Sequence, residues 1–190
     1  PGDIAYVAGS STVILGVSEQ RPIDPHHRFI VTPMAQPGTW GLEMDLMATG
    51  TAISWLAGLL GYDSAEEAMQ DSRNVESDNA PLFLPYVSPG EQGALWDPHL
   101  TGVITGLHLG HERRHLVRGL VDGIVLESLR CIEVLREYGC DGDVLRVAGG
   151  SALDPWFRQL LADATGAQVV APVDGDSDYS AIGAALLLGG

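Results

Sequence analysis

Residues 144–166 of this 190-residue chain read VLRVAGGSALDPWFRQLLADATG, and the prediction of the fold starts from this stretch. Its first part, 144–148, has the length and apolar composition of a buried strand. Gly149 and Gly150 follow as a turn in which no Cβ stands between the backbone and a ligand. The stretch therefore begins as a strand that ends in an open glycine turn.

The remainder of the stretch carries the signals of a helix with both ends marked. Asp154 can cap its first turn, and Pro155 suits its first position. Apolar residues recur at helical spacing up to Gly166, which ends the helix. A strand, a glycine turn and a helix in this order often bring backbone against a nucleotide. An ordinary tight turn gives the same pattern more often, so the rest of the chain has to decide.

The composition is that of one acidic globular domain. The length allows a full core, 45% of the residues are hydrophobic, and no apolar run is long enough to span a membrane. The net charge of -15 argues against nucleic acid binding, and it requires any polyanion to be held locally by backbone N–H groups and metal. Cys131 and Cys140 do not indicate a disulfide framework, and the cytoplasm is the expected compartment. No signal peptide is visible, and the opening Pro1-Gly2-Asp3 looks like a turn cut from a longer chain.

Two short strands are predicted near the start of the chain, at 4–8 and 12–17. The link between them is so short that they must form an antiparallel hairpin. Gly9, Ser10 and Ser11 form its turn and offer backbone N–H groups and hydroxyls. These groups could hold a phosphate, or they could form a plain polar turn, and the local sequence favours neither interpretation.

The remaining elements are a third strand, a group of helices, and then strands and helices in turn. We expect a third strand at 28–32, an irregular segment at 33–41, helices at 42–60, 63–71 and 111–138, an apolar loop at 81–90, a strand at 168–170 and a helix at 179–188. The apolar loop is expected to pack under another element or to face a cleft. Three antiparallel strands followed by alternating helices and strands is the order of the ribonuclease H-like fold, the ATPase domain of actin and of sugar kinases. We therefore predict a single α/β domain of this fold over residues 1–190.

Residues 111–115 match the H-E-x-x-H pattern of zinc proteases. On a helix, His111 and His115 would lie one turn apart on one face, with Glu112 as general base. A third ligand is missing, because Glu133 lies about 27 Å further along the same predicted helix. A polar first turn of a long helix is the better interpretation, and a zinc hydrolase would require stoichiometric zinc.

The chain resembles the C-terminal domain of the FGGY carbohydrate kinases over nearly all of its length. Residues 149–163 are similar to the family signature G-G-G-A-x-S-x-x-W-x-Q-x-x-A-D. Further segments match in the right order: 9–11 resembles a G-T-S phosphate turn, 82–86 with Gly90-Glu91 an F-L-P-Y…G-E-R segment, 102–107 an R-G-x-x-x-G-L segment, and 180–185 a closing S-A-x-G-A-A helix. No single match is specific, but five matches in order indicate the family.

This resemblance implies phosphoryl transfer from ATP, with Mg²⁺, to a hydroxyl of a sugar (pentulose-like) or polyol. It implies a nucleotide site made by Gly9, Ser10, Ser11, Gly106, Gly149, Gly150, Ala152 and Asp154. Gly150 and Asp154 would line the adenine pocket, with close backbone approach at Gly149 and Ala152. The turn at 9–11 would face the phosphates, and Gly106 would face the nucleotide from the other side. Such transfer depends mainly on positioning and charge neutralisation, which glycines, hydroxyls and Mg²⁺ can supply.

Three residues depart from the family pattern. Ser151 replaces a common third glycine, Asp154 replaces Ser or Asn and adds negative charge, and Gln92 replaces an arginine. The family's general-base aspartate would lie upstream of Pro1, so no catalytic residue is expected in this chain. The N-terminal lobe, which holds most of the sugar site, would also lie upstream, and the chain alone is expected to be inactive.

Two other functions remain open at this point. One is a non-catalytic, actin-like nucleotide-binding regulatory module, and the other is the zinc hydrolase described above. The expected partners are a sugar or polyol substrate and the N-terminal lobe, with no nucleic acid and no membrane, and a homodimer is compatible with the sequence.

Overall fold

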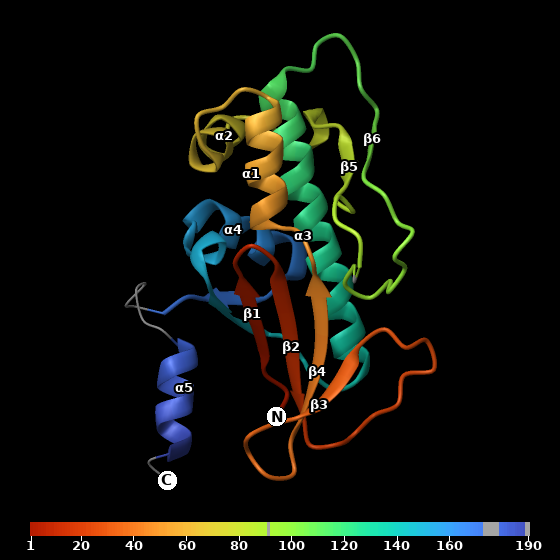
Figure 1. The fold of residues 1–190 in the computed structure, drawn as a ribbon, viewed down its shortest axis with the longest axis vertical. Helices are drawn as coiled ribbons and strands as arrows, with labels where there is room; N and C mark the ends of the chain where they lie inside the picture. Colours follow the sequence, from red (N-terminus) through yellow and green to blue (C-terminus); the bar gives the residue numbers. More distant parts are fainter. Residues whose placement is uncertain (91, 173–178, 189–190) are drawn as a thin grey trace.

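The computed structural model describes residues 1–90, 92–172 and 179–188, with a six-stranded sheet in the order β3-β4-β2-β1-β7-β8 (Figure 1). The strands are β1 (Ile4–Ala8), β2 (Thr12–Ser18), β3 (Ile30–Pro33), β4 (Trp40–Leu46), β7 (Val144–Ala148) and β8 (Gln168–Val170). The first four pair antiparallel, whereas β7 lies parallel to β1 and β8 lies parallel to β7. This arrangement confirms the predicted ribonuclease H-like fold.

Strand β4 corrects the prediction for residues 33–60. A helix was expected over 42–60, but residues 40–46 form β4 and the helix α1 covers only Gly50–Leu59. The reason is the alternation of Leu42, Met44 and Leu46 with two acidic residues, which gives a period of two and buries one face of the strand. β4 pairs with β2 along its whole length and is therefore the third strand of the antiparallel part. The predicted third strand, 28–32, corresponds to β3 on the edge beside it.

The other helices lie close to their predicted positions. They are α2 (Ala65–Ser72), α3 (Arg113–Glu137), α4 (Pro155–Thr165) and α5 (Tyr179–Leu188), with 3₁₀ turns η1 (Ser77–Asn79) and η2 (Gly150–Leu153). Ser64 caps α2 by accepting the Glu67 N–H at 3.1 Å. Gly166 ends α4 in the left-handed conformation, at φ 69°. None of the helices in the described ranges is long and apolar enough to cross a membrane.

Helix α3 joins the parts of the molecule, because it contacts α1, α2, α4 and β2 (Figure 1). The core lies between this helix and the sheet, and its largest fully buried side chains include Ile4, Tyr6, Ile14, Leu42, Met44, Leu120, Ile124, Ile132 and Leu135. The Tyr6 hydroxyl is within 2.9 Å of Ser128 Oγ, and burial raises the pKa of Tyr6 to about 12. The buried tyrosine therefore stays neutral and links the sheet to α3.

The predicted apolar loop, 81–90, is partly a strand. β5 (Leu82–Leu84) pairs with β6 (Val103–Thr105) as a separate two-stranded sheet, and it packs on α3. Phe83 is buried, as expected for a segment that packs under another element. Glu91, part of the G-E-R-like match, lies outside the described residues.

Candidate functional site

Four segments that are distant in the sequence surround one cavity of about 590 Å³, which we call the turn cavity. They are the β1–β2 turn, the start of α1, one side of α2, and the segment from η2 to the start of α4. The lining residues are Gly9, Ser10, Gly50, Thr51, Ile53, Ser54, Ala65, Glu66, Met69, Gly150, Asp154 and Phe157. Apolar side chains, open backbone and hydroxyls therefore meet in one place, and no basic side chain is among the lining residues.

The β1–β2 turn is fixed by α1. The Ser10 carbonyl accepts the N–H groups of Thr49 and Thr51, each at 3.1 Å, and the Gly9 carbonyl accepts the Gly50 N–H at 3.2 Å. Because these carbonyls take up the free donors at the start of α1, the helix end itself does not serve as an anion site. The N–H groups of Ser10 and Ser11 donate to no acceptor among the described residues, so they can bind an anion.

Gly149 and Gly150 are neighbours with different structural roles. Gly149 has φ 89°, and a Cβ there would lie 2.2 Å from the Ala8 carbonyl oxygen. This glycine therefore allows the turn after β7 to pack against the end of β1. Gly150 is exposed, lines the turn cavity, and has no atom within 4 Å of the position a Cβ would take. Its missing side chain keeps a wall of the cavity open.

Asp154 caps α4 and is paired with Arg73, the C-cap residue of α2. Its Oδ1 accepts the N–H of Trp156 at 2.8 Å and that of Phe157 at 3.4 Å. Its Oδ2 accepts a hydrogen bond from Arg73 Nη2 at 2.6 Å. The negative charge that Asp154 adds to the predicted site is therefore balanced by a partner that the motifs did not indicate.

Other residues of the predicted site do not line the turn cavity. Ser11 lies beside it, in the same turn as Ser10. Ala152 is fully buried, and its N–H donates to the Gly149 carbonyl at 3.1 Å, so it supports the turn from the core side. Gly106 follows β6 and is exposed, with φ 80°. The structure thus brings together Gly9, Ser10, Gly150 and Asp154, and it adds walls from α1 and α2 that the sequence analysis missed.

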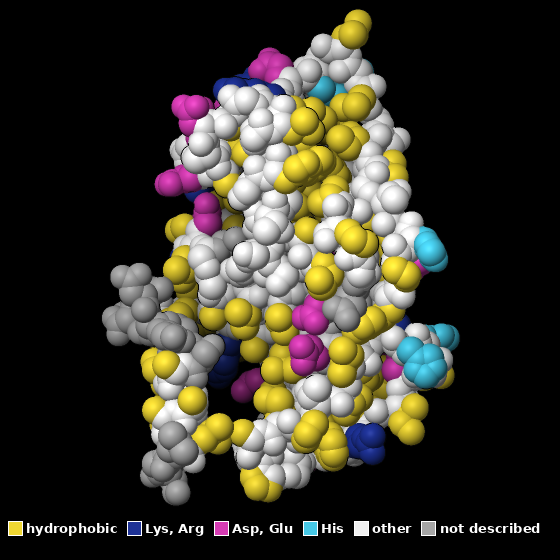
Figure 2. Space-filling view, in the orientation of Figure 1, with side chains coloured by type: hydrophobic (Ala, Val, Ile, Leu, Met, Phe, Trp, Pro, Cys, Tyr) yellow, Lys and Arg dark blue, Asp and Glu magenta, His cyan; other side chains and the backbone are white. Residues whose placement is uncertain are grey.

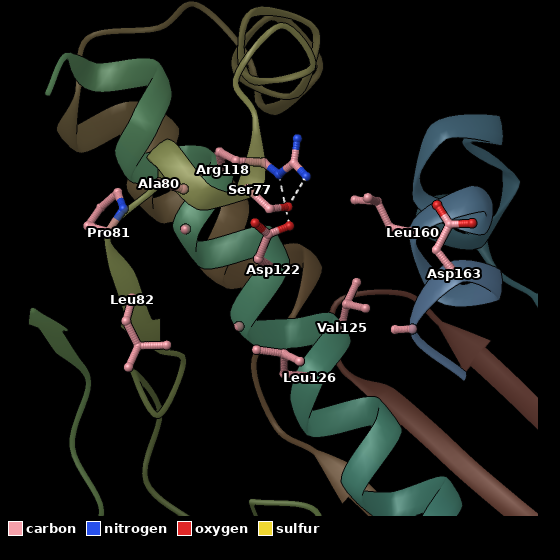
Figure 3. A pocket seen from close by; sticks show the side chains of 13 residues that line it. Ser77, Ala80, Pro81, Leu82, Arg118, Asp122, Val125, Leu126, Leu160 and Asp163 are labelled. Carbon is pink, nitrogen blue, oxygen red and sulfur yellow. Dashed lines mark hydrogen bonds and ion pairs between the residues drawn. The ribbon is translucent and has the colours of Figure 1, made fainter. Parts of the chain in front are cut away.

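A second cavity of about 510 Å³ lies between α3 and α4, and we call it the α3–α4 cavity (Figure 3). Buried Arg118 donates to the Val75 carbonyl and to Ser77 Oγ, and its Nε lies 2.8 Å from Asp122 Oδ1. The apolar residues that line the α3–α4 cavity include Leu82 and Leu160. The guanidinium in this cavity is thus already engaged by protein groups.

The H-E-x-x-H segment forms the start of α3. Glu112 is the N-cap, and its side chain and that of His115 form a capping box, while His111 precedes the helix. The rings of His108 and His111 stack with centroids 3.8 Å apart. Within the described ranges, no group of three or more His, Cys, Asp or Glu side chains is arranged to hold a metal ion. The motif therefore serves as a helix cap in this structure.

The cysteines are free and buried. Burial raises the pKa of the Cys131 thiol to about 12 and also raises that of Cys140. Neither side chain is suited to act as a nucleophile at neutral pH. On the face in Figure 2, carboxylates lie in several separate places, and the basic side chains occupy small separate spots.

Comparison with known proteins matches residues 4–189 to the FGGY family of carbohydrate kinases, C-terminal domain. A glycerol kinase of Saccharolobus islandicus (strain L.S.2.15 / Lassen #1) is 29% identical over 196 residues, which cover 99% of this chain and 38% of that protein. A glycerol kinase of Gluconobacter oxydans (strain 621H) is 28% identical over 185 residues, which cover 95% of this chain and 36% of that protein. The chain thus spans well under half the length of these relatives.

Solved structures show the same fold. A ligand-bound xylulose kinase from Lactobacillus acidophilus aligns with a TM-score of 0.86 at 23% identity, over 99% of this chain and 39% of that chain. A xylulose kinase from Rhodospirillum rubrum aligns with a TM-score of 0.80 at 27% identity, over 98% of this chain and 37% of that chain.

Proposed function

Because the chain belongs to the FGGY family of carbohydrate kinases, as its C-terminal domain, we propose that it is the nucleotide-binding lobe of an ATP-dependent sugar or polyol kinase. The turn cavity carries this proposal. Gly9 and Ser10, Gly150 and Asp154 were expected at a nucleotide from separate motifs, and they line one cavity. A cavity of about 590 Å³ falls within the usual size range of cofactor sites.

In this proposal the base lies against the backbone at Gly150, where a side chain would occupy its place. Ile53, Met69 and Phe157 supply the apolar surface that a flat ring buries. The phosphates extend toward the β1–β2 turn, where the N–H groups of Ser10 and Ser11 are available. The nucleotide is thus bound mainly by shape and backbone, as the overall negative charge of the protein requires.

ATP would supply the phosphoryl group, and Mg²⁺ would balance the charge of its phosphates. Magnesium usually binds through substrate phosphates and one or two carboxylates rather than in an all-protein cage. The described residues form no metal site of their own, so we assign no residue of this chain to Mg²⁺. What this lobe contributes is a fixed position for the nucleotide.

The acceptor and the general base belong to other parts of the kinase in this proposal. The relatives described above are glycerol kinases and xylulose kinases, which supports a polyol or pentulose as acceptor. Loss of positioning alone can be worth roughly 7–11 kcal/mol of a reaction barrier. The 190-residue chain is therefore expected to bind Mg-ADP weakly and to phosphorylate nothing.

Two assays test this function together. Calorimetric titration of the 190-residue chain with Mg-ADP should give a dissociation constant in the millimolar range. A coupled kinase assay on a panel of polyols and pentuloses should give no turnover with this chain, and turnover once it is part of a two-lobed kinase. Rapid turnover by the chain alone, or no nucleotide binding at all, would overturn the proposal. Binding without turnover in the two-lobed protein would favour the regulatory module.

A further inference from the structure

We infer that Arg73 is a positioning residue that fixes Asp154 as a hydrogen-bond acceptor for the exocyclic amino group of the nucleobase. The site would thereby favour adenine over hypoxanthine. This inference rests on the nucleotide-binding function proposed above and deepens it, because Arg73 lies in none of the motifs that point to the nucleotide.

Arg73 reaches the site from the end of α2. It lies one helical turn after Met69, which lines the turn cavity, and its Nη2 is 2.6 Å from Asp154 Oδ2. Its guanidinium carbon also lies 5.9 Å from the centre of the Trp156 ring, and Arg118 lies 5.3 Å from the same ring. Arg73 is therefore close both to the Asp154 carboxylate and to the Trp156 ring, which attracts a cation.

Asp154 is held from two sides as a result. Its Oδ1 is bound by the N–H groups at the start of α4, and its Oδ2 is bound by Arg73. These contacts leave one orientation for the carboxylate plane. Each carboxylate oxygen has two lone pairs, so acceptor capacity remains for a donor that enters the cavity. Without Arg73, the Oδ2 side would lose both its anchor and the charge that balances it beside an anionic ligand.

The chemistry of the acceptor determines which base fits. An ionised carboxylate accepts hydrogen bonds and cannot donate them. Adenine presents an amino group, which donates. Hypoxanthine has a carbonyl oxygen at the same ring position, so two acceptors would face each other. A site built to bind a donor discriminates strongly against an analogue that lacks it, because the buried acceptor is left unpaired.

The experiment compares ADP with IDP, in which a carbonyl oxygen replaces the amino group and the adjacent ring nitrogen carries a proton. Dissociation constants for both nucleotides would be measured with the 190-residue chain and with its Arg73→Met, Arg73→Gln and Arg73→Lys variants. We expect the unmodified protein to prefer ADP by about tenfold or more. In Arg73→Met and Arg73→Gln the preference should fall to less than about threefold, and Arg73→Lys should restore part of it.

Arg113→Met is the matched control. Arg113, in α3, also contacts α2 and the residues before it: its Nη2 lies 4.0 Å from Glu67 Oε1, and its guanidinium lies 3.8 Å from the centre of the Tyr62 ring. Its loss should leave the ADP-to-IDP ratio unchanged. Thermal unfolding of each variant would check that the protein remains folded, which is expected because the Arg73 side chain is about one-third exposed.

Each outcome is decisive. If both neutral Arg73 variants kept the preference for ADP, Arg73 would have no role in selecting the base, and the proposed function would be unaffected. Equal binding of ADP and IDP by the unmodified protein would have the same effect. If the unmodified protein bound neither nucleotide, the proposed function itself would fail.

Discussion

The turn cavity and the α3–α4 cavity have similar volumes, about 590 and 510 Å³, and both include residues of α4. They differ in the state of their polar groups. In the α3–α4 cavity, Arg118 is already engaged with Val75, Ser77 and Asp122. In the turn cavity, the Ser10 N–H has no acceptor among the described residues, and the space beside Gly150 is open. Volume therefore does not separate the two cavities, whereas open backbone and unused donors do.

The difference follows from how each cavity is built. The turn cavity lies where β1 and β7 end and the backbone turns, so peptide groups face the space directly. The α3–α4 cavity lies against a packed helix. Its glycines, Gly119 and Gly123, would place a Cβ only 2.3 Å and 2.2 Å from the carbonyl oxygens of Pro81 and Phe83. Those two glycines allow the segment around β5 to pack closely on α3, which is a structural role.

The largest expected effect is at Gly149, the neighbour of Gly150, which lines the turn cavity. Gly149→Ala should destabilise the fold by about 4 kcal/mol, because the new Cβ meets the Ala8 carbonyl and the backbone there is one that only glycine adopts readily. Urea unfolding measures this loss. Gly58→Ala is the control, since a Cβ at Gly58 has open space around it. Equal stability of the two variants would contradict the packing assigned to Gly149.

Gly150→Val should lower the affinity for ADP and leave the stability of the fold almost unchanged. The stability should change little, because no atom lies within 4 Å of the position that a Cβ would take at Gly150. The affinity for ADP should fall about a hundredfold, or about 2.7 kcal/mol, because the valine side chain enters the turn cavity. Calorimetry and thermal unfolding measure the two quantities, with Gly58→Val as the control. Unchanged ADP affinity would remove Gly150 from the site.

Ser10→Ala tests the phosphate side of the turn cavity. It removes a hydroxyl that can bind a charged group, an interaction worth roughly 1.5–3 kcal/mol. Affinity for Mg-ADP, or transition-state stabilisation in a complete kinase, should fall by about that amount. Since Ser10 is exposed, stability should not change. If the kinetic constants of the variant stayed within twofold of those of the unmodified enzyme, the β1–β2 turn would have only a structural role.

Asp24 lines neither cavity, but it makes the stability of the folded protein depend on pH. Hydrogen bonds from Arg28 hold the pKa of this buried carboxyl well below its usual value. Because the folded pKa lies below the unfolded pKa, the contribution to stability is complete above the unfolded value of about 3.9 and is lost progressively as the pH falls from that value through the lower folded pKa. Stability should drop by about 1 kcal/mol from this group by pH 3.

Urea unfolding from pH 7 to pH 3 would measure this loss. Asp24→Asn should lack that part of the pH dependence, although the variant is less stable at neutral pH. The same pH profile in the variant and in the unmodified protein would show that Asp24 is not the group responsible.

The smallest effect is expected from filling the α3–α4 cavity. Ala164→Leu adds three carbon atoms to its lining, as many as Gly150→Val adds to the turn cavity. ADP affinity should change by less than about 0.5 kcal/mol, which titration of the variant would measure. A loss of affinity comparable with that of Gly150→Val would mean that the two cavities are not independent.

The sequence was sufficient to predict those elements whose signals lie within a few residues of one another. The hairpin around Gly9 and the helix between its Asp154 cap and Gly166 formed as predicted, because a short link and a capping residue act within a few positions. Residues 42–46 were misassigned because the apolar run continues into α1, and strand alternation was read as part of a longer helix. With the start of α1 misplaced, its contribution to the turn cavity could not be predicted.

The Arg73–Asp154 pair could not be predicted for a different reason. Nothing within a few residues of Arg73 marks it, and its partner lies on another helix, so only the folded chain brings them together. Ala152 shows the reverse case, in which a residue in the strongest motif is buried beneath the turn rather than exposed in the cavity. A motif identifies a segment that forms a site, but packing decides which of its side chains face the ligand.

The position of the nucleotide can be tested directly by mapping backbone amide chemical shifts while the isotope-labelled 190-residue chain is titrated with Mg-ADP. If the nucleotide binds in the turn cavity, the largest changes fall on Ser10, Ser11 and Gly150, and the amides of Gly119 and Gly123 in the α3–α4 cavity are unaffected. Changes centred on the α3–α4 cavity, with none at the β1–β2 turn, would contradict the assignment of the nucleotide to the turn cavity.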